Sequence, residues 1–150
     1  MKFKIVRASL KDINNVGNLF DLYRQFYSYK SDINASTNYI EERIKNNESI
    51  IFIAVDANKT GLGFVQLYET FGSLDLGKII ILYDLYVKKN HRKNNIGKQL
   101  MIKSHEYAKK IKAKRIQLST AIDNFIGQSL YESLGYVKDI DFYTYDFEIK

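Results

Sequence analysis

The stretch from residue 88 to residue 98, KKNHRKNNIGK, combines residue types that bind phosphate with residue types that allow tight turns. Asn94, Asn95 and Gly97 tolerate positive φ angles. Apolar residues then recur at helical spacing, which predicts a helix beginning near Asn95. Backbone N–H groups at a helix N-terminus, with Arg and Lys around them, favour a phosphate-bearing anion. The stretch is therefore predicted to be an anion-binding loop.

Asp84 is the one carboxylate in the apolar run 79–87, IIILYDLYV. This run is too apolar and too rich in β-branched and aromatic residues for a half-exposed strand, and predicts a central strand covered on both faces. Burial should raise the pKa of Asp84 towards a range useful for accepting a proton from an amine. The carboxylate could also bind a cationic amine. In a purely structural role, a tyrosine or a backbone group would satisfy it.

A second segment with chemical potential runs from residue 124 to residue 136, NFIGQSLYESLGY. It follows residues 115–122, which alternate apolar and polar side chains as a strand does. Asn124 stands where it could cap the next helix. Tyr131 lies in the helical pattern, either as a core aromatic or as a proton donor, and Gly135 closes the segment.

These two segments resemble the GNAT superfamily of acyl-CoA-dependent N-acyltransferases. Residues 92–97 are similar to its pyrophosphate loop, Arg/Gln-x-x-Gly-x-Gly/Ala, with Asn95 in place of the first Gly. Asn is a frequent substitute for Gly in the left-handed region, whereas the Pro often found shortly after the preceding Val is missing. Residues 124–136 are similar to the superfamily's fifth-strand junction and following helix, with its Asn, its Tyr and its closing Leu-Gly-aromatic. The resemblance extends from about Ile79 to Lys150.

The resemblance implies that acetyl-CoA is the co-substrate and that its acetyl group passes directly to an amine. Asp84 and the tyrosines suggest a primary amine of a small, cationic acceptor, such as a polyamine, an amino acid derivative or an aminoglycoside-like compound. Main-chain groups of Leu85, Tyr86 and Val87 would hold pantetheine, and Asn124 would contact the cofactor or cap its helix. The residues expected to bind pyrophosphate are Arg92, Lys93, Asn94, Asn95, Ile96, Gly97 and Lys98.

The same resemblance gives roles to the remaining candidates. Tyr131 would protonate the leaving sulfur. Asp84 keeps the roles that its place in the apolar strand suggests, as the base or as the ligand of the amine. Tyr23 and Tyr27 lie where members of the superfamily line the acceptor site, although an aromatic cluster on a helix can equally be core. A homodimer through the C-terminal strands is also an expectation of the resemblance.

Two other functions remain open. The first is acetylation of a protein or peptide by the same fold, which needs an open acceptor groove. The second is a non-catalytic module that binds acyl-CoA or RNA. Against this second function stand the presence of both Asp84 and Tyr131 and the lack of exposed aromatics among the basic residues of the turn. We therefore expect no nucleic-acid partner.

Composition narrows the classes of protein. The 150 residues suit a single domain, residues 1–150, and the net charge is +6. With no Cys and two His, a thiolate or His-based metal site is not expected, nor is a cysteine nucleophile. No apolar stretch approaches the ~20 residues that cross a bilayer, and the N-terminus does not resemble a signal peptide, so we expect a cytoplasmic protein without a membrane partner.

The predicted fold class is α/β, a mixed and mostly antiparallel central sheet flanked by helices. Its fourth and fifth strands are expected to splay apart, as the resemblance implies. The polar residues 32–35 are predicted to be a mobile loop, followed by a helix capped at Ser36 or Asn38. The strands are expected at residues 3–8, 49–56, 63–70, 79–87, 115–122, 136–138 and 142–149, and the helices at about 9–29, 36–46, 95–111 and 124–134.

Overall fold

A computed structural model describes residues 2–149, and its strands form one five-stranded sheet in the order β1-β2-β3-β4-β5. The strands are Lys4–Arg7 (β1), Ile50–Val55 (β2), Gly61–Gly72 (β3), Gly77–Val87 (β4) and Ile116–Leu118 (β5). The first four pair with their neighbours in antiparallel fashion, whereas β4 and β5 are parallel. The predicted mixed, mostly antiparallel sheet is confirmed.

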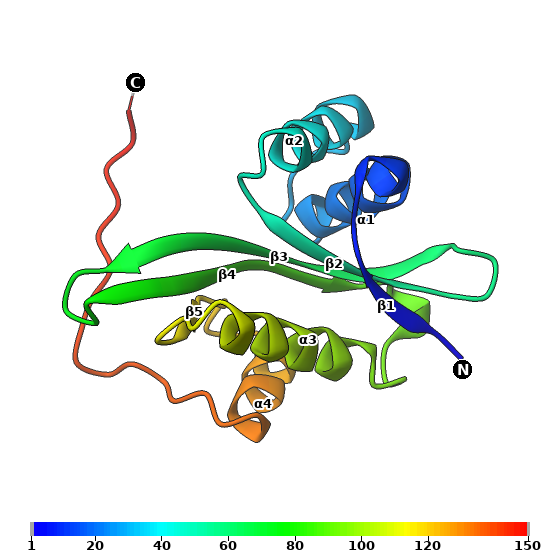
Figure 1. The fold of residues 1–150 in the computed structure, drawn as a ribbon. Coiled ribbons are helices and arrows are strands. Elements are labelled where there is room, and N and C mark those ends of the chain that lie inside the picture. The colour runs from blue at the N-terminus through cyan, green and yellow to red at the C-terminus, as the bar shows by residue number, and fades with distance from the viewer. Residues whose placement is uncertain (1, 150) are drawn as a thin grey trace. The chain divides into compact units, whose positions relative to one another are not determined.

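The helices are η1 (Leu10–Asp12), α1 (Ile13–Phe26), α2 (Ile33–Lys45), η2 (Lys89–His91), α3 (Ile96–Lys110) and α4 (Phe125–Ser133). Helices α1 and α2 lie on one face of the sheet and α3 lies on the other (Figure 1). The chain divides into two compact units, Met1–Ser119 with the sheet and α1 to α3, and Thr120–Lys150 with α4. None of the helices in residues 2–149 is long and apolar enough to cross a membrane.

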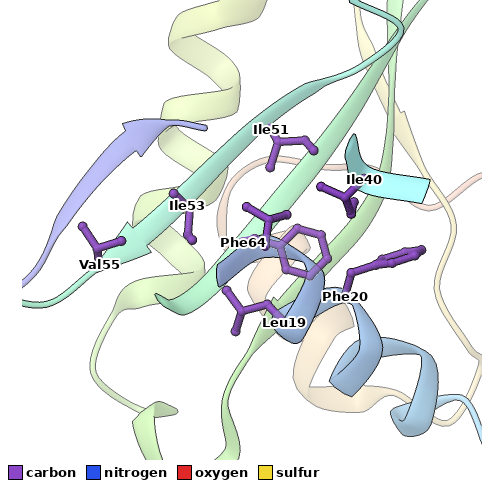
Figure 2. Packing of buried hydrophobic residues seen from close by; sticks show 8 residues of the cluster. Leu19, Phe20, Ile40, Ile51, Ile53, Val55 and Phe64 are labelled. Carbon is purple, nitrogen blue, oxygen red and sulfur yellow. The ribbon is translucent and has the colours of Figure 1, made fainter. Parts of the chain in front are cut away.

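A hydrophobic cluster joins α1 and α2 to the sheet (Figure 2). Ile51, Ile53 and Val55 alternate along β2, so their side chains share the face that α1 covers. Phe64 of β3 meets Phe20 of α1 edge-on, with ring centroids 6.3 Å apart. Burial of side chains of this size contributes about 1.5–3 kcal/mol each, which fixes α1 on the sheet.

Helix α2 begins earlier than the sequence pattern predicted. Residues 33–35, expected in a mobile loop, form its first turn. Asp32 is the N-cap, because its Oδ1 accepts a hydrogen bond of 2.9 Å from the Ala35 N–H. The two predicted caps, Ser36 and Asn38, lie inside the helix. The prediction was wrong because it took Asp32 as a loop residue instead of a helix cap.

The two predicted closing strands, residues 136–138 and 142–149, are absent from the described residues. Residues 136–149 form neither helix nor strand. Phe142, Tyr145 and Phe147 are 81–89% exposed. Alternating apolar residues specify a strand only when a neighbouring strand accepts the backbone hydrogen bonds, so the pattern alone was insufficient.

Candidate active site

Asp84 is buried in the sheet beside an irregularity in β4. Gln66 of β3 pairs with Asp84, but the next residue, Leu67, pairs with Leu82, so Tyr83 is an extra residue. This is a β-bulge, a feature found often next to active sites. Asp84 is 3% exposed, whereas Tyr83 is 67% exposed. The bulge therefore places a buried carboxylate and an exposed ring on consecutive residues.

A buried chain of hydrogen bonds holds the Asp84 carboxylate. Gln66 Nε2 donates to Asp84 Oδ2 over 2.6 Å, and Ser49 Oγ donates to Gln66 Oε1 over 2.8 Å. Ser49 and Gln66 are themselves buried. Because the amide oxygen accepts from Ser49, the amide nitrogen is oriented towards Asp84. The sequence analysis missed both residues, and the only available signal was one glutamine within the apolar strand GFVQLY.

Desolvation dominates the electrostatics of Asp84. Burial raises the pKa of Asp84 to about 6, although hydrogen bonds from Gln66 and Tyr23 oppose the rise. The Tyr23 hydroxyl also lies 3.4 Å from the Tyr83 carbonyl oxygen. Burial, and then the negative charge of Asp84, raise the pKa of Tyr23 above its usual value, so Tyr23 stays protonated. Asp84 can therefore take up or release a proton near neutral pH.

Tyrosines surround this carboxylate, and we refer to Tyr23, Tyr27, Tyr39, Tyr68 and Tyr83 as the tyrosine cluster. Tyr23 and Tyr27 meet edge-on at 5.2 Å between ring centroids, and Tyr68 and Tyr83 do so at 5.8 Å. The hydroxyl groups of Tyr39 and Tyr68 are 2.7 Å apart. Of the two predicted acceptor residues, the structure brings Tyr23 into contact with Asp84 and places Tyr27 against Tyr23. Tyr39, Tyr68 and Tyr83 were not predicted.

The residues predicted to hold acetyl-CoA begin beyond the point where β4 and β5 stop pairing. Pairing between these strands runs from Ile80 with Ile116 to Leu82 with Leu118 and goes no further in the described residues. Leu85, Tyr86 and Val87 pair with β3 on their other side, so their outward backbone groups face no strand. An open edge of this kind suits the amide groups of a pantetheine arm.

The basic loop that follows has the predicted backbone conformation at Asn95. Asn95 is the N-cap of α3 in the left-handed region, with φ 65° and ψ 6°. Lys93 also has a positive φ, 62°, whereas the predicted Asn94 and Gly97 do not. Gln99 N–H donates to the Asn95 carbonyl oxygen, so the preceding N–H groups at Ile96, Gly97 and Lys98 start the helix without intrahelical acceptors. These donors, with Lys93 and Lys98 beside them, fit a pyrophosphate group.

Arg92 connects this loop to the end of α1. Its Nε donates to the Val87 carbonyl oxygen over 3.0 Å. Its guanidinium carbon lies 5.6 Å from the ring centroid of Phe26 and 5.8 Å from that of Tyr86. Phe26 in turn meets Tyr27 edge-on, with ring centroids 5.1 Å apart, so Arg92 links the loop to the tyrosine cluster through Phe26.

Asn124 and Tyr131 belong to the second unit. Asn124 caps α4, because its Oδ1 accepts from the Gly127 N–H over 3.2 Å, and its Nδ2 donates to Thr120 Oγ1 over 2.9 Å. Tyr131 is half-buried and lies 6.1 Å from Tyr136 between ring centroids. Burial, and then Tyr131, raise the pKa of Tyr136 to about 12. The cap is observed, and the roles of Asn124 at the cofactor and of Tyr131 as an acid stay predictions.

One depression in the surface lies away from this carboxylate. A shallow depression of about 440 Å³ between β1 and α3 is lined by Phe3, Ile5, Gln99, Lys103 and others, including Asn95 but not Asp84. It therefore does not coincide with the carboxylate site. Among residues 2–149, no group of three or more His, Asp or Glu side chains could hold a metal ion.

The sequence and the fold match known acetyltransferases. The family model described as "Acetyltransferase (GNAT) family" matches residues 16–136. The uncharacterized N-acetyltransferase YhfO of Bacillus subtilis is 37% identical over 94% of each chain. The crystal structure of a probable acetyltransferase, 34% identical, superposes with a TM-score of 0.91 over 98% of each chain.

More distant structures share the fold alone. An aminoglycoside acetyltransferase from an uncultured soil metagenomic sample, determined in complex with trehalose, is 17% identical. It superposes with a TM-score of 0.84 over 99% of this chain and 97% of its own. Identity this low does not transfer an acceptor. By contrast, the family model matches residues 16–136 and the two closer matches cover 94% and 98% of the chain, so the chain belongs to the GNAT family of acetyltransferases.

Proposed function

We propose that the protein transfers the acetyl group of acetyl-CoA directly to a primary amine of a small, cationic acceptor. The observation that carries this proposal is the buried Asp84 carboxylate, positioned at the β4 bulge beside Tyr23. The family supplies the reaction class, and this carboxylate supplies the chemistry that the amine requires.

An acceptor amine must lose a proton before it attacks a thioester. An aliphatic amine with a pKa near ~10.4 is neutral in only about one part in 10³ at pH 7, which costs roughly 4 kcal/mol. With its pKa raised to about 6, Asp84 is mostly ionised at pH 7 and yet more basic than an ordinary carboxylate. It would first pair with the ammonium group and then accept its proton, directly or through water.

Acetyl-CoA would lie along the open edge of β4. In this proposal the backbone groups of Leu85, Tyr86 and Val87 hold the pantetheine arm, and the loop from Arg92 to Lys98 holds the pyrophosphate. Asn124 would contact the same molecule. Tyr131 would protonate the departing sulfur, whose thiol has a pKa near ~8.5 and which can therefore also leave as a thiolate.

The test is an acetyl-CoA-dependent assay of thiol release with the full chain and a panel of amines. Primary amines should release coenzyme A, whereas a tertiary amine of matched size should not, because it has no N–H to acetylate. Below pH 6 the kcat/KM should fall about tenfold per pH unit as Asp84 becomes protonated. If acetyl-CoA binds in calorimetry but no primary amine is acetylated between pH 6 and 9, the proposal is wrong.

A further inference from the structure

We infer that the acceptor is a monoamine, with a single ammonium group on an aromatic or apolar body, and not a polycation. This inference rests on the proposed function and names the class of substrate for the same site. Three observations support it: the supply of carboxylates, the aromatic residues next to Asp84 and the arginine side chains that lie over three aromatic rings.

The acceptor side of the sheet offers one carboxylate for a cation. On α1, α2, β3 and β4, the other carboxylates are already engaged. Glu41 pairs with Lys45, Glu42 pairs with Arg43, and Glu69 pairs with Lys78. Asp21 accepts four hydrogen bonds, from Gln25, Ser31, Asp32 and Ser36. Asp84 is thus the carboxylate on these elements for which the described residues supply neither a cation nor a backbone N–H.

The surface next to that carboxylate is aromatic. Tyr83 is 67% exposed and Phe26 is 51% exposed, and Tyr27 and Tyr39 are also exposed. Aromatic rings of this kind bind a flat or apolar body by stacking and attract a single ammonium group over the ring face. A polyamine or an aminoglycoside has little apolar surface to place there.

Arginine side chains of α1, α2 and the basic loop lie over three aromatic rings, and an uncompensated one would repel additional positive charges. The guanidinium carbon of Arg43 lies 4.5 Å from the ring centroid of Tyr39. That of Arg24 lies 5.4 Å from the Tyr29 centroid, and that of Arg92 lies 5.6 Å from the Phe26 centroid. Glu48 and Glu42 offset the charge of Arg43. Arg24 donates to Ser36 Oγ, which is a neutral acceptor. Arg92 donates to the Val87 carbonyl oxygen, and the pyrophosphate of acetyl-CoA would offset its charge in the proposed complex. A second or third ammonium group would therefore find no further carboxylate on these elements and would be repelled by Arg24.

The decisive comparison uses three amines: 2-phenylethylamine (one charge, one ring), ethylamine (one charge, no ring) and spermidine (three charges). The kcat/KM for 2-phenylethylamine should exceed both others by at least roughly tenfold at low salt. Equal or faster acetylation of spermidine would overturn the inference and leave the proposed function standing.

Variants separate the two causes. Tyr83→Ala should lower kcat/KM for 2-phenylethylamine at least roughly fivefold more than it lowers kcat/KM for ethylamine. The matched control is Phe71→Ala, which removes another exposed ring from β3 at the end away from Asp84. Arg24→Glu should lower the ratio of kcat/KM for 2-phenylethylamine to kcat/KM for spermidine at least roughly threefold. Lys110→Glu on α3, which makes the same change of charge, should leave that ratio unchanged. If Tyr83→Ala and Phe71→Ala had the same effect, and Arg24→Glu and Lys110→Glu had the same effect, the inferred substrate class would be contradicted.

A binding measurement keeps this test independent of turnover. NMR titration of the full chain with each amine, in the presence of coenzyme A, ranks affinities without any reaction. A preference for 2-phenylethylamine in binding without acetylation would refute the proposed function but support the substrate class. Binding of none of the amines would overturn the inference itself.

Discussion

Asp21 and Asp84 are both buried, at 5% and 3% exposure, yet their surroundings move their pKa values in opposite directions. Asp21 accepts hydrogen bonds of 2.7–3.1 Å from Gln25, Ser31, Ser36 and the Asp32 N–H. Burial alone would raise its pKa, but these four donors together outweigh burial and hold the pKa below the ordinary 3.8. Asp84 accepts hydrogen bonds only from a glutamine amide and a tyrosine hydroxyl among the described residues. Burial therefore has the larger effect and raises its pKa.

In the proposed function, this difference separates a structural carboxylate, Asp21, from a chemical one, Asp84. Asp21 links α1 to the start of α2, and its donors fill the acceptor capacity of both oxygens. Asp84 is held in place by Gln66 but keeps capacity for a proton or an ammonium group. A buried charge with few partners destabilises the fold, and such groups are found where function requires them.

Exchange of each carboxylate for the isosteric amide should break this comparison most clearly. Asp84→Asn should lower kcat/KM by about 10³-fold, because it removes a general base, while acetyl-CoA affinity in calorimetry stays within about twofold. Asp21→Asn is the matched control and should change kcat/KM less than about threefold wherever the variant remains folded. Comparable losses from both variants would mean that Asp84 is structural.

The pH dependence of stability should differ in sign between the two sites. The folded-state pKa of Asp84 lies above the unfolded value of 3.8, so Asp84 lowers the free energy of unfolding as pH rises from about 4 to about 6. The full loss is about 3 kcal/mol, from a shift of roughly two units at 1.36 kcal/mol each. Asp84→Asn should therefore become more stable than the wild type across that window.

Asp21 should show the reverse. Its folded-state pKa is lowered, so its contribution is complete above the unfolded value of 3.8 and is lost as pH falls through the folded value. Asp21→Asn should therefore be less stable than the wild type at pH 6, with the gap closing in acid. Urea unfolding at pH 3 to 7 measures both trends, and a pH-independent difference for either variant would argue against its assignment.

Tyr131 sharpens the comparison by testing the second proton transfer, to the sulfur. Tyr131→Phe removes the hydroxyl and keeps the ring, so acetyl-CoA affinity should change little. We expect kcat to fall at least roughly tenfold, a modest figure for a general acid because a thiolate can leave unaided. A variant with full kcat in the thiol-release assay would make Tyr131 a packing residue.

The smallest effect is expected at Asn95, which is independent of both carboxylates. Its φ of 65° costs a β-branched residue about 1–2 kcal/mol, so Asn95→Val should weaken acetyl-CoA binding roughly fivefold or more. Asn95→Gly should leave the affinity unchanged or improve it. Equal affinities for all three chains by calorimetry would disconnect this loop from acetyl-CoA.

Local patterns predicted most of the elements around the site. The run 79–87 lies within β4, and the helix predicted to begin near Asn95 begins at Ile96. The left-handed conformation of Asn95 was also expected from its residue type. These predictions succeeded because strand burial and helix starts depend mainly on neighbouring residues.

Other features of the site depend on contacts between elements. Counting in register from the Gly72–Gly77 pair would place Gln66 opposite Tyr83, and only the bulge brings Gln66 to Asp84. Ser49, the residue just before β2, joins the hydrogen bonds of Gln66 and Asp84 from the other side of β3. The prediction of closing strands at residues 136–138 and 142–149 was wrong for a related reason. A strand requires a pairing partner, which local sequence does not specify.

By itself, the sequence determined which residues can do chemistry here: a carboxylate in an apolar strand, a basic loop before a helix and tyrosines along a helix. Residue types and their spacing carry that information because propensity and amphipathicity act over a few residues. Only the tertiary structure showed that Asp21 is buried as well, and that the pKa of Asp21 is lowered whereas that of Asp84 is raised. Packing of α1 and the β4 bulge set the number of donors around each carboxylate, and the balance between desolvation and hydrogen bonding set its pKa.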